Sequence, residues 1–243
     1  MTNASPASRP ERPEGPEGPE GPERLEFADA GEAADVAAFL ARLLRYDKAA
    51  AVRLQAGGGA LAVFGRPPSF EVLAIRTARL GRPRELDVTV SAGELLESVD
   101  ESVGTALVPE AVTGPPWAGV LPPRAGWQRL PGLPAADEVR RLVAEAVAAF
   151  RVRTEELPPD KRTRSELDRI GSEVWSRPVG DTDLPVRAAH AAQALGFLRP
   201  PVADGPVAPL DLLGAGAWLR LRTPYGSIAL RRAGLGALSV TPT

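Results

Sequence analysis

The 243-residue sequence contains no cysteine, one histidine and one methionine. Without cysteine the chain can form no disulfide, no zinc–thiolate or iron–sulfur site, and no thiol nucleophile. Only two of its 29 basic residues are lysine, Lys48 and Lys161. The arginine excess, together with abundant alanine, glycine and proline, is typical of a GC-rich genome. A single arginine therefore carries little functional weight by itself.

Long apolar runs are also missing. No uninterrupted apolar stretch approaches the roughly 18 residues that a membrane-spanning helix requires, so we expect no membrane association. Residues 1–10 lack the charged segment followed by an apolar one that marks a secretory signal, and we predict a cytoplasmic location. With 44% hydrophobic and 25% charged residues, the chain has the composition of a globular protein with a substantial core.

Residues 1–26 form a low-complexity acidic segment in which Gly-Pro-Glu recurs at Gly15, Gly18 and Gly21. Three such triplets cannot hold a collagen-like triple helix, and few large apolar side chains are present to offset the cost of ordering. We predict a disordered, extended, polyproline-like arm. Six glutamates and three arginines give it a net charge of −3, and the whole chain carries −2, which leaves residues 27–243 near +1.

Hydrophobic periodicity and turn residues predict helices and strands in separate runs. The expected elements are a helix over 32–46, strands over 51–55, 60–64, 70–76 and 86–90, a short helix capped by Ser91, three helices after residue 135, and strands over 218–223, 227–231 and 235–240. Asp160 is the expected cap of the second of the three helices, and Pro185 opens the third. Strands, then helices, then strands predict an α+β fold with a largely antiparallel sheet covered by helices on one side.

We predict a single domain over residues 27–243. It has two candidate halves, 27–103 and 135–243, joined by a proline- and tryptophan-rich segment over 104–134. Each half would consist of one helix followed by three strands, and a pseudo-twofold axis would relate the two.

An ungapped comparison within the sequence motivates this internal duplication. Residues 52–63 align with residues 219–230, and Arg53 is matched by Arg220. The alternative explanation is that any two amphipathic hairpins with a central glycine resemble each other through their period-two pattern.

The candidates for chemistry are few. His190 is the lone histidine and lies on the apolar side of a predicted helix. A catalytic histidine needs a nucleophile and an orienting carboxylate, so we expect a hydrogen-bonded, partly buried side chain. Asp181 and Asp183 have a spacing seen in some divalent-metal sites, but acids that cap a helix are expected just before Pro185. The sequence thus predicts no catalytic residue, no metal site and no cofactor.

The hairpin near the C-terminus carries the strongest candidate binding residues. Trp218, Arg220 and Arg222 alternate onto one face of its first strand, and Arg231 follows in the second. Arginine beside an exposed aromatic ring can grip phosphate, stack on a base or bind an acidic partner. The alternative is an ordinary solvent-facing sheet surface.

Trp117 and Trp127 stand among prolines in the 104–134 segment. They either line a binding groove or pin a long connection over a sheet edge, and long loops in compact domains usually need such anchors.

Three functional hypotheses remain. We favour a non-catalytic binding or adaptor protein that acts through contacts with a protein partner. The second is an anion or nucleic-acid binder that uses the arginine–tryptophan face of the hairpin, with the acidic arm competing for that face. Nucleic acid is disfavoured because residues 27–243 are nearly neutral. The third is an enzyme that uses carboxylates and His190. The oligomeric state is left open.

Overall fold

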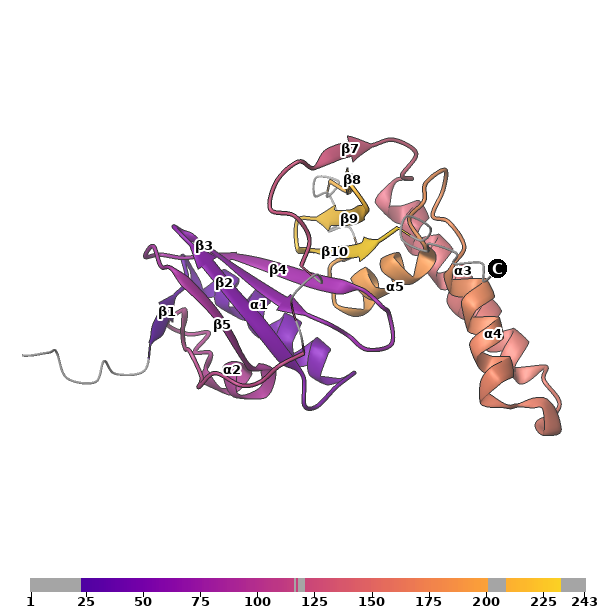
Figure 1. The fold of residues 1–243 in the computed structure, drawn as a ribbon, viewed down its shortest axis with the longest axis horizontal. Helices are drawn as coiled ribbons and strands as arrows, with labels where there is room; N and C mark the ends of the chain where they lie inside the picture. Colours follow the sequence, from indigo (N-terminus) through magenta and orange to yellow (C-terminus); the bar gives the residue numbers. More distant parts are fainter. Residues whose placement is uncertain (1–22, 116, 118–120, 201–208, 233–243) are drawn as a thin grey trace, which may run out of the picture.

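The computed structural model describes residues 23–115, 117, 121–200 and 209–232 (Figure 1). The described helices are α1 (Ala30–Leu44), α2 (Ala92–Ser98), α3 (Ala136–Glu155), α4 (Arg164–Trp175) and α5 (Val186–Ala194). The described strands are β1 (Arg24–Glu26), β2 (Ala51–Gly57), β3 (Ala60–Gly65), β4 (Leu73–Arg79), β5 (Leu86–Ser91), β6 (Thr105–Leu107), β7 (Gln128–Leu130), β8 (Asp211–Ala215), β9 (Trp218–Thr223) and β10 (Gly226–Arg231). None of these helices combines the length and the apolar character needed to cross a membrane.

Eight strands form one sheet in the order β5-β2-β3-β4-β10-β9-β8-β7, and every neighbouring pair is antiparallel. The central pair joins the two parts of the chain, because β4 belongs to the first half and β10 to the second. Ser227 lies opposite Ile75 in this pair, and Ala229 lies opposite Leu73. The small second sheet pairs β1 with β6. The predicted α+β fold with a largely antiparallel sheet is confirmed.

Strand alternation gives the sheet two different faces. Leu54, Val63 and Leu221 point to the inner face, where they share one large core with the helices. The opposite side, which we call the outer face, carries a smaller cluster made of Phe64, Leu73, Ile75, Ala229 and Trp117. The helices therefore cover one side of the sheet, as predicted, and part of the 104–134 segment covers the other.

Helices α3 and α4 form a hairpin that projects from the sheet (Figure 1). Its apolar side packs near α5, where the Phe150 and Trp175 rings lie 5.6 Å apart. Its surface carries ion pairs spaced three or four residues apart, such as those between Arg169 and both Glu166 and Glu173. The alternation of charges on exposed helix faces explains why these residues stay in water.

A buried arginine ties the two halves together on the inner side. The Arg76 guanidinium, on β4, donates hydrogen bonds to Asp35 (3.0 Å) and Glu32 (3.3 Å) of α1 and to the backbone carbonyl of Tyr225 (2.9 Å). Arg199, which follows α5, also binds Asp35 (2.6 Å). Residues far apart in the sequence therefore share one ion-pair network.

The topology is compatible with an internal duplication, although not with the strand correspondence that the sequence comparison gave. In each half a helix precedes a three-stranded meander, α1-β2-β3-β4 and α5-β8-β9-β10, and the last strands meet in the middle of the sheet. Counted outward from the central β4–β10 pair, β3 is therefore equivalent to β9, and β2 is equivalent to β8. The comparison of residues 52–63 with 219–230 instead matches β2 with β9, which is a shift by one strand. The strand predicted over 235–240 lies outside the described residues.

Two segments assigned to loops or to the arm form strands. Residues 24–26 pair with β6 as β1, and Leu25 is fully buried, so the prediction of disorder is wrong for these three residues. Residues 211–215 form β8 in a stretch predicted as a proline-rich loop, and all five are buried. β1 has only three residues and β8 is buried throughout, so neither shows the alternation that marks a half-exposed strand.

The helix starts depart from prediction in two places. Ser91 caps α2 as expected, since its hydroxyl accepts a hydrogen bond from the Glu94 amide (3.3 Å). Thr163 rather than Asp160 caps α4. Pro185 occupies the cap position of α5 instead of its first turn, and this helix has no side-chain cap.

Candidate functional site

A groove with a volume of about 730 Å³ lies at one end of the sheet, where β2 and β4 begin and β3 and β10 end. Its apolar wall includes Pro67, Pro68 and Leu73. Its charged and aromatic lining comes from Asp47, Arg66, Glu71, Arg187, Trp218 and Arg231. Antiparallel pairing of β4 with β10 brings these residues from distant parts of the chain to the same edge.

The Arg187 side chain is only partly satisfied in this groove. Its Nε atom is buried and has no hydrogen-bond partner among the described residues. The nearest carboxylate oxygen, from Glu71, lies 3.8 Å away, which is beyond hydrogen-bond distance. Glu71 has a φ of 53°, and no other described non-glycine residue has a positive φ. Such strained backbone is typical of functional loops.

Trp218 and Arg231 form the opposite wall. The guanidinium carbon of Arg231 lies 5.3 Å from the centre of the Trp218 ring, within the range of a cation–π interaction. Trp218 is half-buried, so part of its ring remains available to a ligand.

Beyond this wall, the outer face carries a second group of arginines. The Arg220 guanidinium lies 5.7 Å from the Trp127 ring. Burial, and then the nearby Arg222, lower the pKa of Arg220. Arg222 and Arg129 both bind the carboxylate of Asp211, each at 2.5 Å. Asp211 compensates Arg222, whereas the described residues place no carboxylate within ion-pair distance of Arg220.

The structure separates the six predicted binding residues into three settings. Trp218 and Arg231 line the groove; Trp127, Arg220 and Arg222 lie on the outer face beside it; Trp117 is buried against the sheet. Trp117 therefore pins the connecting segment over the sheet, which was the alternative interpretation of the two tryptophans.

Sequence analysis missed Arg66, Glu71 and Arg187. Arg66 follows β3, Glu71 lies in the loop before β4, and Arg187 lies in the first turn of α5. No local motif links the three. The sole signal near them is Pro67-Pro68, which marks a stiff turn after a strand.

His190 belongs to an aromatic stack away from any described carboxylate partner. Its ring stacks on Trp175 with centroids 4.7 Å apart and meets the edge of Phe70 at 5.2 Å. The side chain is partly buried, as predicted, but its contacts in the described structure are with rings and not with hydrogen-bonding groups. Burial lowers its pKa.

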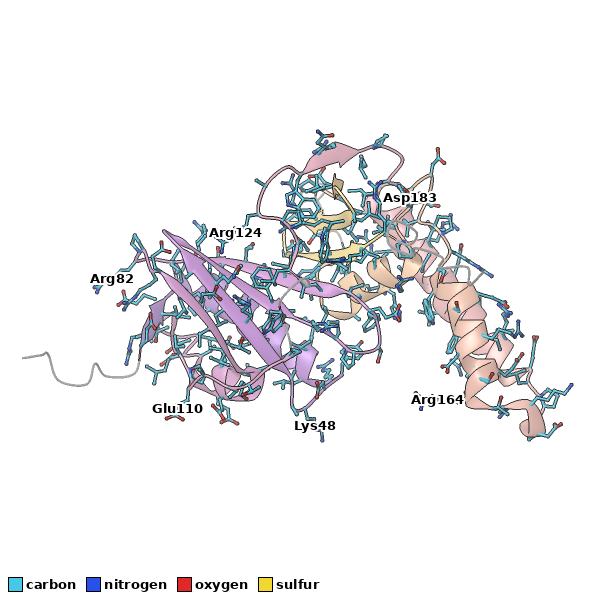
Figure 2. All side chains as sticks on the ribbon, viewed as in Figure 1. Lys48, Arg82, Glu110, Arg124, Arg164 and Asp183 are labelled. Carbon is cyan, nitrogen blue, oxygen red and sulfur yellow. The ribbon has the colours of Figure 1, made fainter. Side chains whose placement is uncertain are left out.

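Asp181 and Asp183 do not cap α5, so the capping interpretation is wrong. Asp183 lies 4.0 Å from Arg232 and is otherwise exposed (Figure 2). Thr182 instead organises the turn, because its hydroxyl donates to the Val179 carbonyl and accepts from the Leu184 amide. In the parts of the chain that the structure describes, no group of three or more histidine and acidic side chains is arranged to hold a metal ion.

The lowered pKa of His190 predicts a pH dependence of stability. Unfolding restores the ordinary pKa of about 6.5, so as the pH falls through that value the unfolded chain takes up a proton that the folded chain resists. We expect the free energy of unfolding, measured by urea denaturation, to fall as the pH drops from about 7 toward 5. The variant His190→Phe keeps the ring contacts and should lose this component. An identical pH profile for both proteins would contradict the assignment.

Two protein-family models match this chain, and the boundary between the two matched regions lies in the connecting segment, residues 104–134. Residues 21–119 match a model described as "Domain of unknown function (DUF8010)". Residues 122–235 match another, described as "Domain of unknown function (DUF8185)". Two family models thus cover the chain in succession. A comparison with curated proteins gives no match.

Residues from both matched regions line the groove. Arg66 and Glu71 come from the first matched region, and Arg187, Trp218 and Arg231 from the second. Both matched regions of this chain therefore contribute to the lining of the groove.

Proposed function

We propose that this protein is a non-catalytic binding protein of the cytoplasm that captures an extended acidic segment of a protein partner in the groove. The observation that carries the proposal is the convergence of three arginines, Arg66, Arg187 and Arg231, beside the half-buried ring of Trp218. The groove is open along one end of the sheet, which suits an extended chain.

The chemistry of the lining favours carboxylates. A guanidinium group binds a carboxylate through paired, charge-assisted hydrogen bonds. Arg187 has a donor without a partner in the described structure, so a ligand carboxylate would gain a hydrogen bond without breaking one. Pro67, Pro68 and Trp218 supply apolar surface for the remainder of the segment.

A second candidate function rests on Arg220. Its half-buried guanidinium faces Trp127 without a described carboxylate partner, an arrangement that fits a phosphate and a stacked base. Asp211 lies next to this patch. Its charge, together with the near-neutral charge of residues 27–243, disfavours a long nucleic-acid backbone, which needs an extended basic face, so the acidic peptide is preferred. The enzyme hypothesis ranks third because His190 makes no described ion pair with a carboxylate.

A binding experiment on the full chain tests the proposal. The probe is a fluorescein-labelled 12-residue peptide of alternating glutamate and alanine, and its glutamine counterpart serves as the peptide control. We expect Arg187→Gln and Arg231→Gln each to weaken binding about tenfold, the effect of about one lost charged hydrogen bond. Affinity should also fall as salt is added.

Arg164→Gln is the matched control variant. Arg164 is almost fully exposed on the projecting helical hairpin and does not line the groove, so this variant should bind within about twofold of wild type (Figure 2). Equal affinities for Arg187→Gln and Arg164→Gln would overturn the proposal. Displacement of the peptide by a single-stranded DNA 12-mer that binds more tightly would favour the second candidate.

A further inference from the structure

The acidic arm has a sequence period that matches one backbone conformation. Proline and glutamate both recur every third residue, proline at 10, 13, 16, 19 and 22 and glutamate at 11, 14, 17, 20 and 23. A polyproline II helix has three residues per turn and rises about 3.1 Å per residue. In that conformation all five prolines would share one edge and all five glutamates another, with successive glutamates about 9 Å apart.

The groove offers a complementary surface for each edge. Polyproline segments dock on aromatic-lined grooves, and Trp218 with Pro67 and Pro68 provides such a surface. Arg66, Arg187 and Arg231 provide the positive charge for a row of glutamates. The net charges also favour this contact, since the arm carries −3 and residues 27–243 are near +1.

The arm is long enough to reach the groove. It leaves the fold at β1, which is held beside the turn that follows β2: Gly81 donates to the Glu26 carbonyl (2.8 Å), and Arg84 donates to the carbonyls of Arg24 (3.3 Å) and Gly58 (2.9 Å). The groove lies at the other end of β2, where Ala51 lines it. The seven residues of β2 span about 23 Å. Residues 1–22 span up to about 68 Å as a polyproline helix.

We infer that the N-terminal arm docks in the groove of its own chain and competes there with the acidic segment of the partner. This inference rests on the proposed function, because both ligands use the same arginines. Tethering gives the arm an effective concentration in the millimolar range, so even a weak contact is substantially occupied. The arm is thus an autoinhibitory segment that a tighter-binding partner displaces.

The absence of cysteine allows a direct distance measurement in the full chain. Spin labels are placed through Gly15→Cys in the arm and Lys48→Cys, an exposed position between Asp47 and Ala49 of the groove lining (Figure 2). We expect a short-distance population that falls by at least half when Glu11, Glu14, Glu17 and Glu20 are replaced by glutamine. Arg187→Gln combined with Arg231→Gln should have the same effect, because it removes the other side of the contact.

A control label pair separates loss of docking from a change in the fold. Lys48→Cys paired with Arg164→Cys, two positions outside the arm, should give distances that none of these substitutions changes (Figure 2). Identical distributions from the groove pair in wild type and in both variants would overturn the inference.

Binding of a free (Gly-Pro-Glu)₄ peptide then distinguishes this inference from the proposed function. In the arm-neutralised chain, in which Glu11, Glu14, Glu17 and Glu20 are replaced by glutamine, the arm no longer competes for the groove. This chain should therefore bind the free peptide about fivefold more tightly than wild type. Equal affinities for these two chains, with weaker binding by Arg187→Gln, would overturn the arm contact and support the groove. A docked arm with no binding of any free acidic peptide to the arm-neutralised chain would support the arm contact and overturn the partner proposal.

Discussion

Replacing Trp117 by alanine is expected to lower the free energy of unfolding by about 4 kcal/mol. The Trp117 side chain is 7% exposed and packs on Phe64, Leu73, Ile75 and Ala229 of the outer face. Truncation removes the largest side chain of this cluster and exposes the strands beneath it to water. Urea denaturation followed by circular dichroism measures the change.

Trp127→Ala is the matched control. Trp127 is half-buried, and its indole nitrogen donates one hydrogen bond to the Pro123 carbonyl (2.9 Å). Its truncation should cost about 1 kcal/mol, and Trp117→Phe should restore most of the stability lost in Trp117→Ala. Equal losses for Trp117→Ala and Trp127→Ala would mean that Trp117 does not pin the connecting segment.

Replacing Arg76 by alanine is expected to cost about 3 kcal/mol. Arg76 is 5% exposed, and its loss leaves Glu32 and Asp35 close together with less compensating charge, and the Tyr225 carbonyl without this donor. Because these partners lie in both halves of the chain, the substitution weakens the contact between them. The same denaturation experiment, followed by near- and far-ultraviolet circular dichroism, should show a lower midpoint.

Arg79→Ala controls for the general loss of an ion pair. Arg79 also binds Glu32, at 2.8 Å, but its side chain is 70% exposed. Exposed ion pairs contribute little, so we expect a much smaller loss of stability than for Arg76→Ala. A loss for Arg79→Ala as large as that for Arg76→Ala would contradict the role assigned to burial.

Local signals predicted much of the fold. The hairpin over 218–231 and the Ser91 cap follow from residues within a few positions of each other: alternating apolar side chains around a turn, and a hydroxyl three residues before the amide that it accepts from. The strand at 211–215 was missed because its residues are all buried and have no period of two.

The groove could not be predicted in the same way. Four of its lining residues belong to three separate segments: Arg66 and Glu71 to the loop between β3 and β4, Arg187 to α5, and Trp218 to β9. Only the pairing of β4 with β10 brings those segments together. Trp218 and Arg231 were identified from the sequence because they lie on one local hairpin, where the pattern of side chains is visible without the partner strand.

Composition and short-range periodicity were sufficient to predict the α+β class, the absence of thiol chemistry, the acidic triplet arm and the two sides of each hairpin. Only the folded arrangement shows which strands meet at the groove, which tryptophan is buried and which arginines have a donor without a partner among the described residues. Those outcomes depend on contacts between residues far apart in the sequence, such as Trp117 with Phe64 and Ala229, and no local pattern encodes such contacts.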